Sequence, residues 1–164
     1  MSDKINNNFS VRFASLNDIP TILKFIKELA AYEKLENEVT ATEDILREWI
    51  FEKNKCEVLI ALENNIEIGY ALFFHNFSTF LGKAGIYLED LYITPNYRGL
   101  GYGKKLLKEV AKIAVERGCE RLDWQCLDWN KSSIDFYLSL KAKEMKGWIS
   151  YRLSHESLKE FACR

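Results

Sequence analysis

The sequence predicts an α/β fold, with one central mixed sheet covered by helices on both faces. Short runs with strand character alternate with amphipathic segments in the order β-α-α-β-β-β-α-β-α-β-β-α, so helices interrupt the strands along the chain. The chain has 164 residues, of which 48% are hydrophobic, and this suits a single core of ordinary size. We therefore expect one domain over residues 9–164, after a disordered or poorly ordered polar stretch at residues 1–8.

The bulk composition argues against several classes of protein. The formal net charge is −1, so there is no basic surplus for binding nucleic acid. The apolar runs are far shorter than a bilayer span, and the N-terminus lacks a signal-peptide core. The four cysteines have no C-x-x-C spacing and accompany only two histidines, which argues against a metal site. These features predict a cytoplasmic protein that uses no metal and has no nucleic-acid or membrane partner.

In the first half of the chain, helix-start signals separate the predicted strands. Ser15 and Asp18 have the spacing of a capping box, and Pro20 suits the first turn of the helix that follows. A second capping box, from Thr40 to Glu43, starts another helix. The expected elements are helices at 18–34 and 40–53 and strands at 9–13, 57–62, 66–75 and 86–93, with a loop at 76–85.

Two glycines mark irregular positions in these elements. Gly69 lies inside a predicted strand and indicates a β-bulge, while Gly118 suits the C-terminal cap of a helix that ends near residue 115. The expected elements after that helix are a strand at 121–127, a helix at 132–140, two closing strands at 143–146 and 148–153, and a helix at 154–161.

A glycine-rich stretch at residues 98–104 lies between the strand at 86–93 and the next helix. A helix N-terminus offers unpaired backbone N–H groups and the positive end of the helix dipole, so it suits phosphate oxygens. The glycine spacing is neither that of a P-loop nor G-x-G-x-x-G, because Gly99 and Gly103 have only three residues between them. Taken alone, the stretch also fits a glycine-rich turn before a surface helix.

Three segments resemble the GNAT superfamily of N-acetyltransferases. Arg98, Gly101 and Gly103 match its R-x-x-G-x-G pyrophosphate loop, and residues 130–137 match its second signature, N-x-x-(A/S)-I-x-F-Y. The stretch at 26–33, taken with Tyr87-Leu88-Glu89-Asp90, resembles the diamine (spermidine/spermine) N-acetyltransferase branch. The similarity runs over nearly the whole chain.

The resemblance implies a fold, a co-substrate and a set of site residues. The fold is a single domain with a mostly antiparallel sheet of six to seven strands, of which the fourth and fifth splay apart. Acetyl-CoA is the implied co-substrate, and a homodimer with contacts from Trp148 onward is the implied assembly. The residues implied to bind acetyl-CoA are Leu91, Tyr92, Ile93, Arg98, Gly99, Leu100, Gly101, Tyr102, Gly103, Lys104, Asn130, Ser133 and Tyr137, and those implied to bind the amine are Tyr32, Glu33, Glu89 and Trp148.

Amine acetylation needs a base and an acid, and two residues have suitable chemistry. An alkylamine is mostly protonated at neutral pH, so it must lose a proton before it attacks the thioester. Glu89 lies among apolar neighbours in the sequence, which would raise its pKa and suit it as the base, whereas Asp90 beside it is expected to be structural. The phenol of Tyr137 has an ordinary pKa of about 10, close to that of a thiol, and suits the acid. Direct attack in a ternary complex needs no acyl-enzyme.

The same residues also fit plainer roles. Glu89 fits a strand residue paired with a lysine, Tyr137 fits a core aromatic, and Tyr32 and Glu33 fit a solvated helix end. Trp148 fits a packing residue equally well. From the residues alone, these readings stay open.

The amine is less well defined than the acetyl donor. Lys146 precedes Gly147-Trp148 where the diamine branch has an acid. Lys141 replaces the glycine of a Leu-Gly-Ala turn, so either Lys141 is strained in a left-handed conformation or the turn differs locally. A polyamine, a diamine or a lysine-like amine therefore all remain open as substrates. The alternatives to a small-molecule enzyme are a protein or peptide N-acetyltransferase and a non-catalytic acyl-CoA-binding sensor.

Overall fold

The computed structural model describes residues 8–163, so the expectation for residues 1–7 lies outside the described part. The chain divides into two compact units, one that ends at Gln125 and one that begins at Cys126. We describe each unit by itself. Among residues 8–163, no helix is long and apolar enough to cross a membrane.

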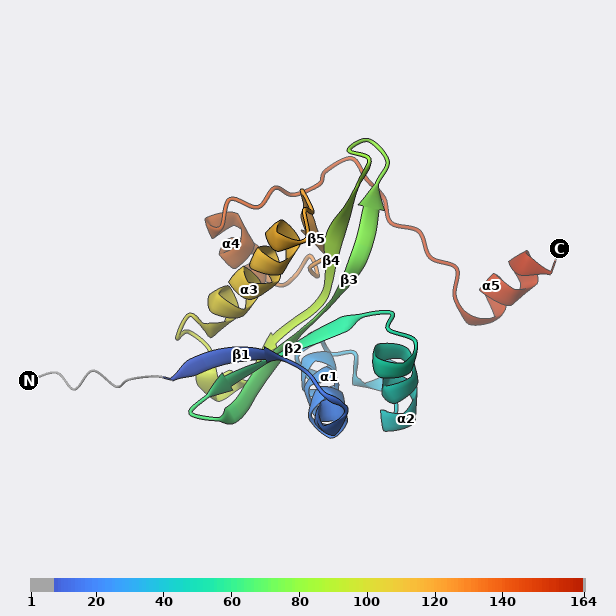
Figure 1. The fold of residues 1–164 in the computed structure, drawn as a ribbon. Coiled ribbons are helices and arrows are strands. Elements are labelled where there is room, and N and C mark those ends of the chain that lie inside the picture. The colour runs from blue at the N-terminus through green and yellow to red at the C-terminus, as the bar shows by residue number, and fades with distance from the viewer. Residues whose placement is uncertain (1–7, 164) are drawn as a thin grey trace, which may run out of the picture. The chain divides into compact units, whose positions relative to one another are not determined.

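The first unit contains a five-stranded mixed sheet (Figure 1). Its strands, in spatial order, are β1 (Phe9–Phe13), β2 (Glu57–Glu63), β3 (Ile66–Ser78), β4 (Lys83–Ile93) and β5 (Leu122–Trp124). The first three pairings are antiparallel, and only β4 and β5 run parallel. The predicted fold class is confirmed, but the count of six to seven strands was too high for the described residues.

Helices cover both faces of this sheet (Figure 1). On one face lie α1 (Ile19–Glu33) and α2 (Glu43–Leu46), and α2 continues into a π-helical segment, Arg47–Glu52. The other face is covered by α3 (Tyr102–Glu116), which buries Leu106 and Val110 completely. Burial of this amphipathic stripe, rather than helix propensity, is the main source of stability for such a helix.

The core on the α1 face is partly aromatic. Phe25 of α1 is fully buried and stacks on Tyr70 of β3, with ring centroids 5.7 Å apart. Tyr92 of β4 tilts against Phe25 at 5.9 Å. These rings fix α1 against the middle of β3 and the end of β4, which is where the site lies.

The helix starts agree only partly with the sequence. The capping box of Ser15 and Asp18 is confirmed, because Asp18 Oδ2 accepts hydrogen bonds from the backbone N–H and the hydroxyl of Ser15. The second capping box was wrong: the N-cap is Thr42, whose hydroxyl oxygen accepts from the N–H of Ile45 at 3.3 Å. Thr40 has a glutamate three residues later and Thr42 does not, so the capping-box spacing selected the wrong threonine.

The loop expected at 76–85 was also wrong. The β3–β4 ladder continues to the pairs Phe77–Ala84 and Ser78–Lys83, which leaves only a short turn. Gly82 in that turn has φ 63°, a conformation that favours glycine. The paired backbones form the ladder even though the side chains near the tip have little strand character.

Two bulges interrupt the strand pairings. In β3, Ile68 is an extra residue between the pairs Gly69–Ala61 and Glu67–Leu62, which confirms the bulge expected at Gly69. A Cβ on Gly69 would lie 2.2 Å from the carbonyl oxygen of Tyr92, so the close approach of β3 to β4 requires glycine here.

The second unit contains α4 (Lys131–Ser139) and α5 (His155–Ala162). The two strands predicted at 143–146 and 148–153 are wrong for this chain, because neither stretch has strand pairing. Of the two expectations for Lys141, strain is the one confirmed. Its φ is 65°, and it follows α4 in the position that usually holds glycine.

Candidate active site

The predicted anion site is the turn that leads into α3. Gly99 and Gly101 have φ of 76° and 81°, and a Cβ on either would meet nothing within 4 Å. Gly101 is the N-cap, the first turn of α3 contains no acid, and Lys104 lies in that turn. The first N–H groups of a helix have no partner inside the helix. The loop is therefore open in front of these groups, which fits a pyrophosphate.

The side chain of Tyr102 anchors this helix start. It is buried, its ring stacks on Phe9 at 5.0 Å, and its hydroxyl donates to Glu63. Lys105 lies over both rings, 5.1 Å from Phe9 and 5.2 Å from Tyr102. Tyr102 can therefore offer a ligand its backbone N–H, while its side chain holds the loop on β1 and β2.

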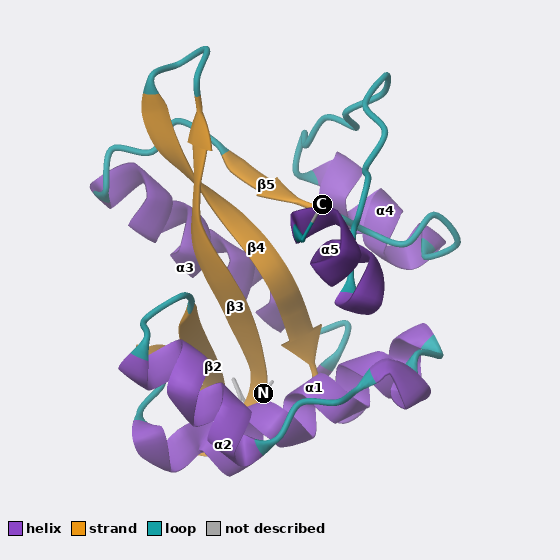
Figure 2. Ribbon diagram, turned by 90° about the vertical axis from the view of Figure 1, so that its right-hand side faces the viewer, coloured by secondary structure: helices purple, strands orange, loops and turns teal. Residues whose placement is uncertain are grey.

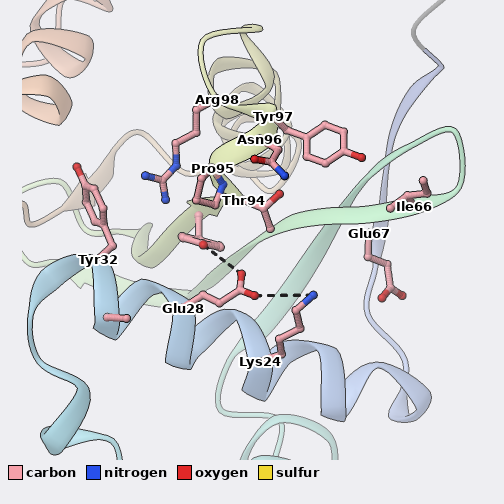
Figure 3. A pocket seen from close by; sticks show the side chains of 12 residues that line it. Lys24, Glu28, Tyr32, Ile66, Glu67, Thr94, Pro95, Asn96, Tyr97 and Arg98 are labelled. Carbon is pink, nitrogen blue, oxygen red and sulfur yellow. Dashed lines mark hydrogen bonds and ion pairs between the residues drawn. The ribbon is translucent and has the colours of Figure 1, made fainter.

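The side chain of Arg98 turns from the loop toward α1 (Figure 3). Its Nε donates to the carbonyl oxygen of Ile93 at 2.8 Å. The guanidinium lies over the rings of Tyr32, at 4.7 Å, and Tyr92, at 5.3 Å. Four of the predicted site residues, from three different elements, are thus brought together.

The last part of β4 has an open edge. The pairing of β4 with β5 covers only Ile86 to Leu88, so the two strands part from Glu89 onward (Figure 2). On the other edge, the N–H of Thr94 donates to Ile68 of β3 at 2.8 Å. Because strand residues alternate in the direction of their N–H groups, Leu91 and Ile93 present theirs away from β3. This is the predicted splay of the fourth and fifth strands.

Glu89 is the extra residue of the bulge in β4, between the pairs Leu88–Phe73 and Asp90–Leu72. Bulges often occur beside active sites, where they redirect a side chain. The apolar surroundings expected for Glu89 are not found, because its side chain is exposed. Its role as the base stays a prediction.

A group of acids lies on the α1 side of the same bulge. The hydroxyl of Tyr70 donates to Asp90 Oδ2 at 2.7 Å, yet burial and the charge of Glu89 raise the pKa of Asp90. The pKa of Glu33 is raised by burial and by the charge of Asp90. Two carboxyl groups thus lie where the ionised form is disfavoured, and a cation beside them would relieve that cost. The sequence analysis assigned Asp90 a structural role. Because neighbouring residues of a strand point to opposite faces of the sheet, the sequence could have indicated that Asp90 lies on the other face from Glu89.

Next to this group, a pocket opens between α1 and the turn after β4 (Figure 3). Its volume is about 680 Å³. Glu28 lies at its centre, where it accepts a hydrogen bond from the hydroxyl of Tyr92 at 3.1 Å and lies 3.8 Å from Lys24 Nζ. The pocket is lined by Lys24, Glu28, Ala31, Tyr32, Ile66, Glu67, Tyr92, Thr94, Pro95, Asn96, Tyr97 and Arg98.

Comparison with protein families decides the class of the molecule. The model of the Acetyltransferase (GNAT) family matches residues 23–141, well over half of the chain. The chain belongs to this acetyltransferase family.

Known proteins agree with this placement. Thialysine N-epsilon-acetyltransferase of Sus scrofa is 38% identical over 164 residues, which cover 93% of this chain and 96% of that protein. Spermidine/spermine N(1)-acetyltransferase-like protein 1 of Homo sapiens is 34% identical over 94% of this chain and 24% of its own length. A solved integron cassette protein of V. cholerae superposes with a TM-score of 0.79 at 25% identity, over 94% of this chain and 97% of that chain. The expected diamine acetyltransferase-like branch is confirmed.

The remaining predicted residues of this acetyltransferase lie in the second unit. Asn130 is buried and caps α4, because its side-chain oxygen accepts from the N–H of Ser133 at 3.2 Å. Tyr137 is half-buried, with its ring 5.2 Å from that of Phe136. Trp148 is 77% exposed and lies outside any helix or strand. The roles of all these residues stay predictions.

Proposed function

We propose that this acetyltransferase transfers the acetyl group of acetyl-CoA to a primary amine of a small molecule, by direct attack in a ternary complex. One observation carries the proposal. The open edge of β4 has the acids Glu89 and Asp90 at one end and leads, at the other, into the glycine loop before α3. The proposed anion site and the proposed amine site would thus lie along one stretch of strand.

The chain offers backbone groups along the whole of this stretch. The N–H groups of residues 99–104 would hold the diphosphate, and that of Ile93 the pantetheine. Acetyl-CoA supplies an acetyl thioester when bound. The N–H of Leu91 would stabilise the charge that develops on the carbonyl oxygen, as backbone donors do in other acyl transfers. Asn130 and Ser133 are proposed as further contacts.

Two side chains would move the protons. Glu89, exposed at its bulge, accepts the proton of the ammonium group directly or through water, and the free amine then attacks. As the new C–N bond forms and the C–S bond breaks, the hydroxyl of Tyr137 protonates the departing sulfur, and the second proton lost from the attacking nitrogen passes through solvent to restore the phenol. Tyr32, Glu33 and Trp148 are proposed to line the amine site. Near neutral pH, the acids Glu33 and Asp90 would attract the ammonium form of the substrate into that site.

The proposed setting of the enzyme rests on three observations. The family match runs across the boundary at residue 125, which supports one acetyltransferase domain over residues 9–164. None of the four cysteines forms a disulfide in the described residues, which suits the reducing cytoplasm. Apolar side chains from Trp148 to Leu153 are exposed, which supports a homodimer.

Two measurements on the purified protein test the proposal. Calorimetry should detect acetyl-CoA binding, and a panel of polyamines, diamines and lysine-like amines should release free thiol from acetyl-CoA. Binding without turnover of any amine would favour the non-catalytic sensor, and turnover of peptides alone would favour the protein acetyltransferase. An absence of binding would overturn the assignment as a whole.

The variant Tyr137→Phe tests the proposed acid. It keeps the ring and removes the hydroxyl, so kcat should fall about 100-fold while the Kd for acetyl-CoA stays the same. Tyr151→Phe, a change at an exposed tyrosine of the same unit, is the control and should leave kcat unchanged. An unchanged kcat in Tyr137→Phe would remove Tyr137 from the mechanism.

A further inference from the structure

We propose that Arg98 is a positioning residue of the amine site: its side chain holds the last turn of α1, which carries Tyr32 and Glu33, against the turn after β4. This inference rests on the proposed function, because the amine site belongs to it. It gives the arginine of the R-x-x-G-x-G pattern a different task from the binding of acetyl-CoA that the resemblance implies.

Two hydrogen-bond donors of Arg98 are already used inside the turn after β4. Its backbone N–H donates to the carbonyl oxygen of Pro95 at 3.1 Å, and its side-chain Nε donates to that of Ile93 at 2.8 Å. The guanidinium extends from the loop toward α1 (Figure 3). The backbone groups proposed for the diphosphate therefore begin after Arg98, at residues 99–104.

The guanidinium of Arg98 joins the loop to α1. Its central carbon lies 4.7 Å from the ring centre of Tyr32 and 5.3 Å from that of Tyr92. A side-chain hydrogen bond also links Arg98 to Tyr92. A planar guanidinium stacks on aromatic faces in a way that a compact ammonium group does not. Tyr32 is 37% exposed, and the guanidinium over its ring limits how far that ring can move.

A second contact ties the same side of α1 to β4. The hydroxyl of Tyr92 donates to Glu28 at 3.1 Å. Burial, as the largest cause, and this hydrogen bond raise the pKa of Tyr92 to about 12, so at neutral pH the phenol keeps the proton that it donates. Glu28 and Tyr32 are four residues apart on α1, so their side chains lie on one side of the helix. Arg98 thus contacts the helix directly at Tyr32 and indirectly through Tyr92.

The order of this last turn matters because α1 ends at the proposed amine site. Glu33 is the last residue of α1, and Lys34 after it has a left-handed φ of 62°, so no further helical turn supports Tyr32 and Glu33. Burial and the charge of Asp90 raise the pKa of Glu33, which places this carboxyl group within electrostatic reach of the bulge in β4. Helix ends fray readily. Without Arg98, amine binding would have to order the last turn, and KM for the amine would rise.

Two variants separate the tasks of positioning and of binding CoA, because Arg98→Met and Lys104→Met each remove one positive charge beside the glycine loop. Arg98→Met should raise KM for the amine about five- to tenfold, the size that a partly desolvated cation–π contact supports, and leave kcat and the Kd for CoA within about threefold. Lys104→Met, in the first turn of α3, should instead weaken CoA binding more than it raises KM. A weaker Kd for CoA with an unchanged KM in Arg98→Met would overturn the inference.

Calorimetry with CoA gives the Kd, and thiol release at saturating acetyl-CoA gives KM. The amine is whichever of spermidine, cadaverine and lysine the parent protein acetylates fastest. An unchanged Kd also shows that a variant is folded. Arg47→Met is the matched control, because Arg47 is an exposed arginine of the π-helical segment that does not line the pocket, and it should change neither constant.

The variant Arg98→Lys distinguishes positioning from charge. Lysine keeps the charge that would attract a diphosphate, but it cannot stack flat on a ring and hydrogen-bond both Ile93 and Tyr92 at the same time. Arg98→Lys should therefore raise KM for the amine about as much as Arg98→Met does. Full rescue by lysine would contradict a positioning role.

A double-variant cycle tests whether Arg98 acts through Tyr32. Tyr32→Leu removes the ring and should raise KM on its own. If the arginine acts through that ring, adding Arg98→Met should raise KM by less than about twofold more. Two effects that multiply would show that Arg98 acts independently of Tyr32, and the inference would be wrong.

The outcomes for the parent protein keep the inference and the proposed function apart. If the parent acetylates one of the three amines and Arg98→Met has unchanged kinetics, only the inference fails. If the parent acetylates no amine, the proposed function itself fails, and the inference fails with it.

Discussion

Asp90 lies in an environment that disfavours its charge. Its carboxyl group is buried beside Glu89, and the hydrogen bond from Tyr70 offsets only part of the burial cost, so its folded-state pKa lies above the ordinary value. A raised carboxyl pKa means that the folded state holds its proton more tightly than the unfolded state. Stability is therefore lost as pH rises from the unfolded pKa, near 4, through the folded pKa.

The variant Asp90→Asn should relieve this cost. The asparagine oxygen can still accept from Tyr70, while the buried charge is gone, so the thermal midpoint at pH 7 should rise. At pH 3, the carboxyl group of Asp90 is protonated in both the folded and the unfolded state, so the gain should disappear. Thermal denaturation at the two pH values measures the effect, and the same variant should bind the amine more weakly. A lower midpoint at pH 7 would contradict the assigned environment.

Lys141 stores backbone strain at the end of α4. It has φ 65°, its N–H donates to the carbonyl of Leu138, and the next N–H donates to the carbonyl of Tyr137, so the turn holds it in the left-handed region. Lys141→Gly should stabilise the protein by about 0.5–1 kcal/mol, because glycine has no Cβ penalty there. Chemical denaturation measures the change. Lys141→Ala removes the charge and keeps the Cβ, and it should give no gain.

At the scale of elements, an ion pair joins the end of β1 to the start of α1. Asp18 accepts from Arg12 through both carboxylate oxygens, each at 2.7 Å, and from the backbone and hydroxyl of Ser15. These bonds hold the pKa of Asp18 well below its usual range, with the Arg12 hydrogen bonds as the largest cause. The resulting stability is present above the unfolded pKa and is lost as pH falls below it.

Asp18→Asn should therefore have the opposite effect to Asp90→Asn. It should cost about 2 kcal/mol at pH 7, because it removes the two short hydrogen bonds between Arg12 and a buried carboxylate and leaves Arg12 only the longer contact with Glu67. The difference from the parent protein should shrink as pH falls below about 4. Urea denaturation across that range measures both statements. A constant difference at every pH would mean that the ion pair contributes little and that packing explains the loss.

Local signals in the sequence predicted the elements whose ends are chemically marked. The capping box at Ser15, the bulge at Gly69 and the glycine loop at 98–104 all have such marks. The extension of the β3–β4 hairpin has no such mark, because the pairing of Phe77 with Ala84 depends on the partner backbone rather than on either side chain. The absent strand at 148–153 is the reverse case, since it has an alternating apolar pattern but no ladder partner among residues 8–163.

At the scale of the whole molecule, the site was harder to predict than the fold. Motif spacing marked the loop at 98–104, yet the pocket depends on contacts between residues far apart in the sequence, such as Tyr92 with Glu28. No spacing rule connects α1 to the end of β4. Likewise, the sequence analysis expected apolar surroundings for Glu89, which is exposed, because the bulge changes the alternation that separates exposed from buried positions.

The exposed apolar residues of the C-terminal segment predict the assembly. Ile149, Tyr151 and Leu153 would share one face of an extended strand, and the first two are 75% and 89% exposed. Such an exposed apolar row favours association, and we expect it to pair with a second copy of the chain. Light scattering should then give about twice the monomer mass of 19.2 kDa at micromolar concentration.

Charge placed in this row should separate the copies. The double variant Ile149→Asp and Tyr151→Asp buries two carboxylates in the expected interface, and it should shift the mass to that of one chain. Phe80→Asp is the matched control: Phe80 is 95% exposed in the β3–β4 turn, outside the row, so its variant should stay dimeric. A parent protein that is monomeric at these concentrations, or a double variant that remains dimeric, would show that this row is not the interface.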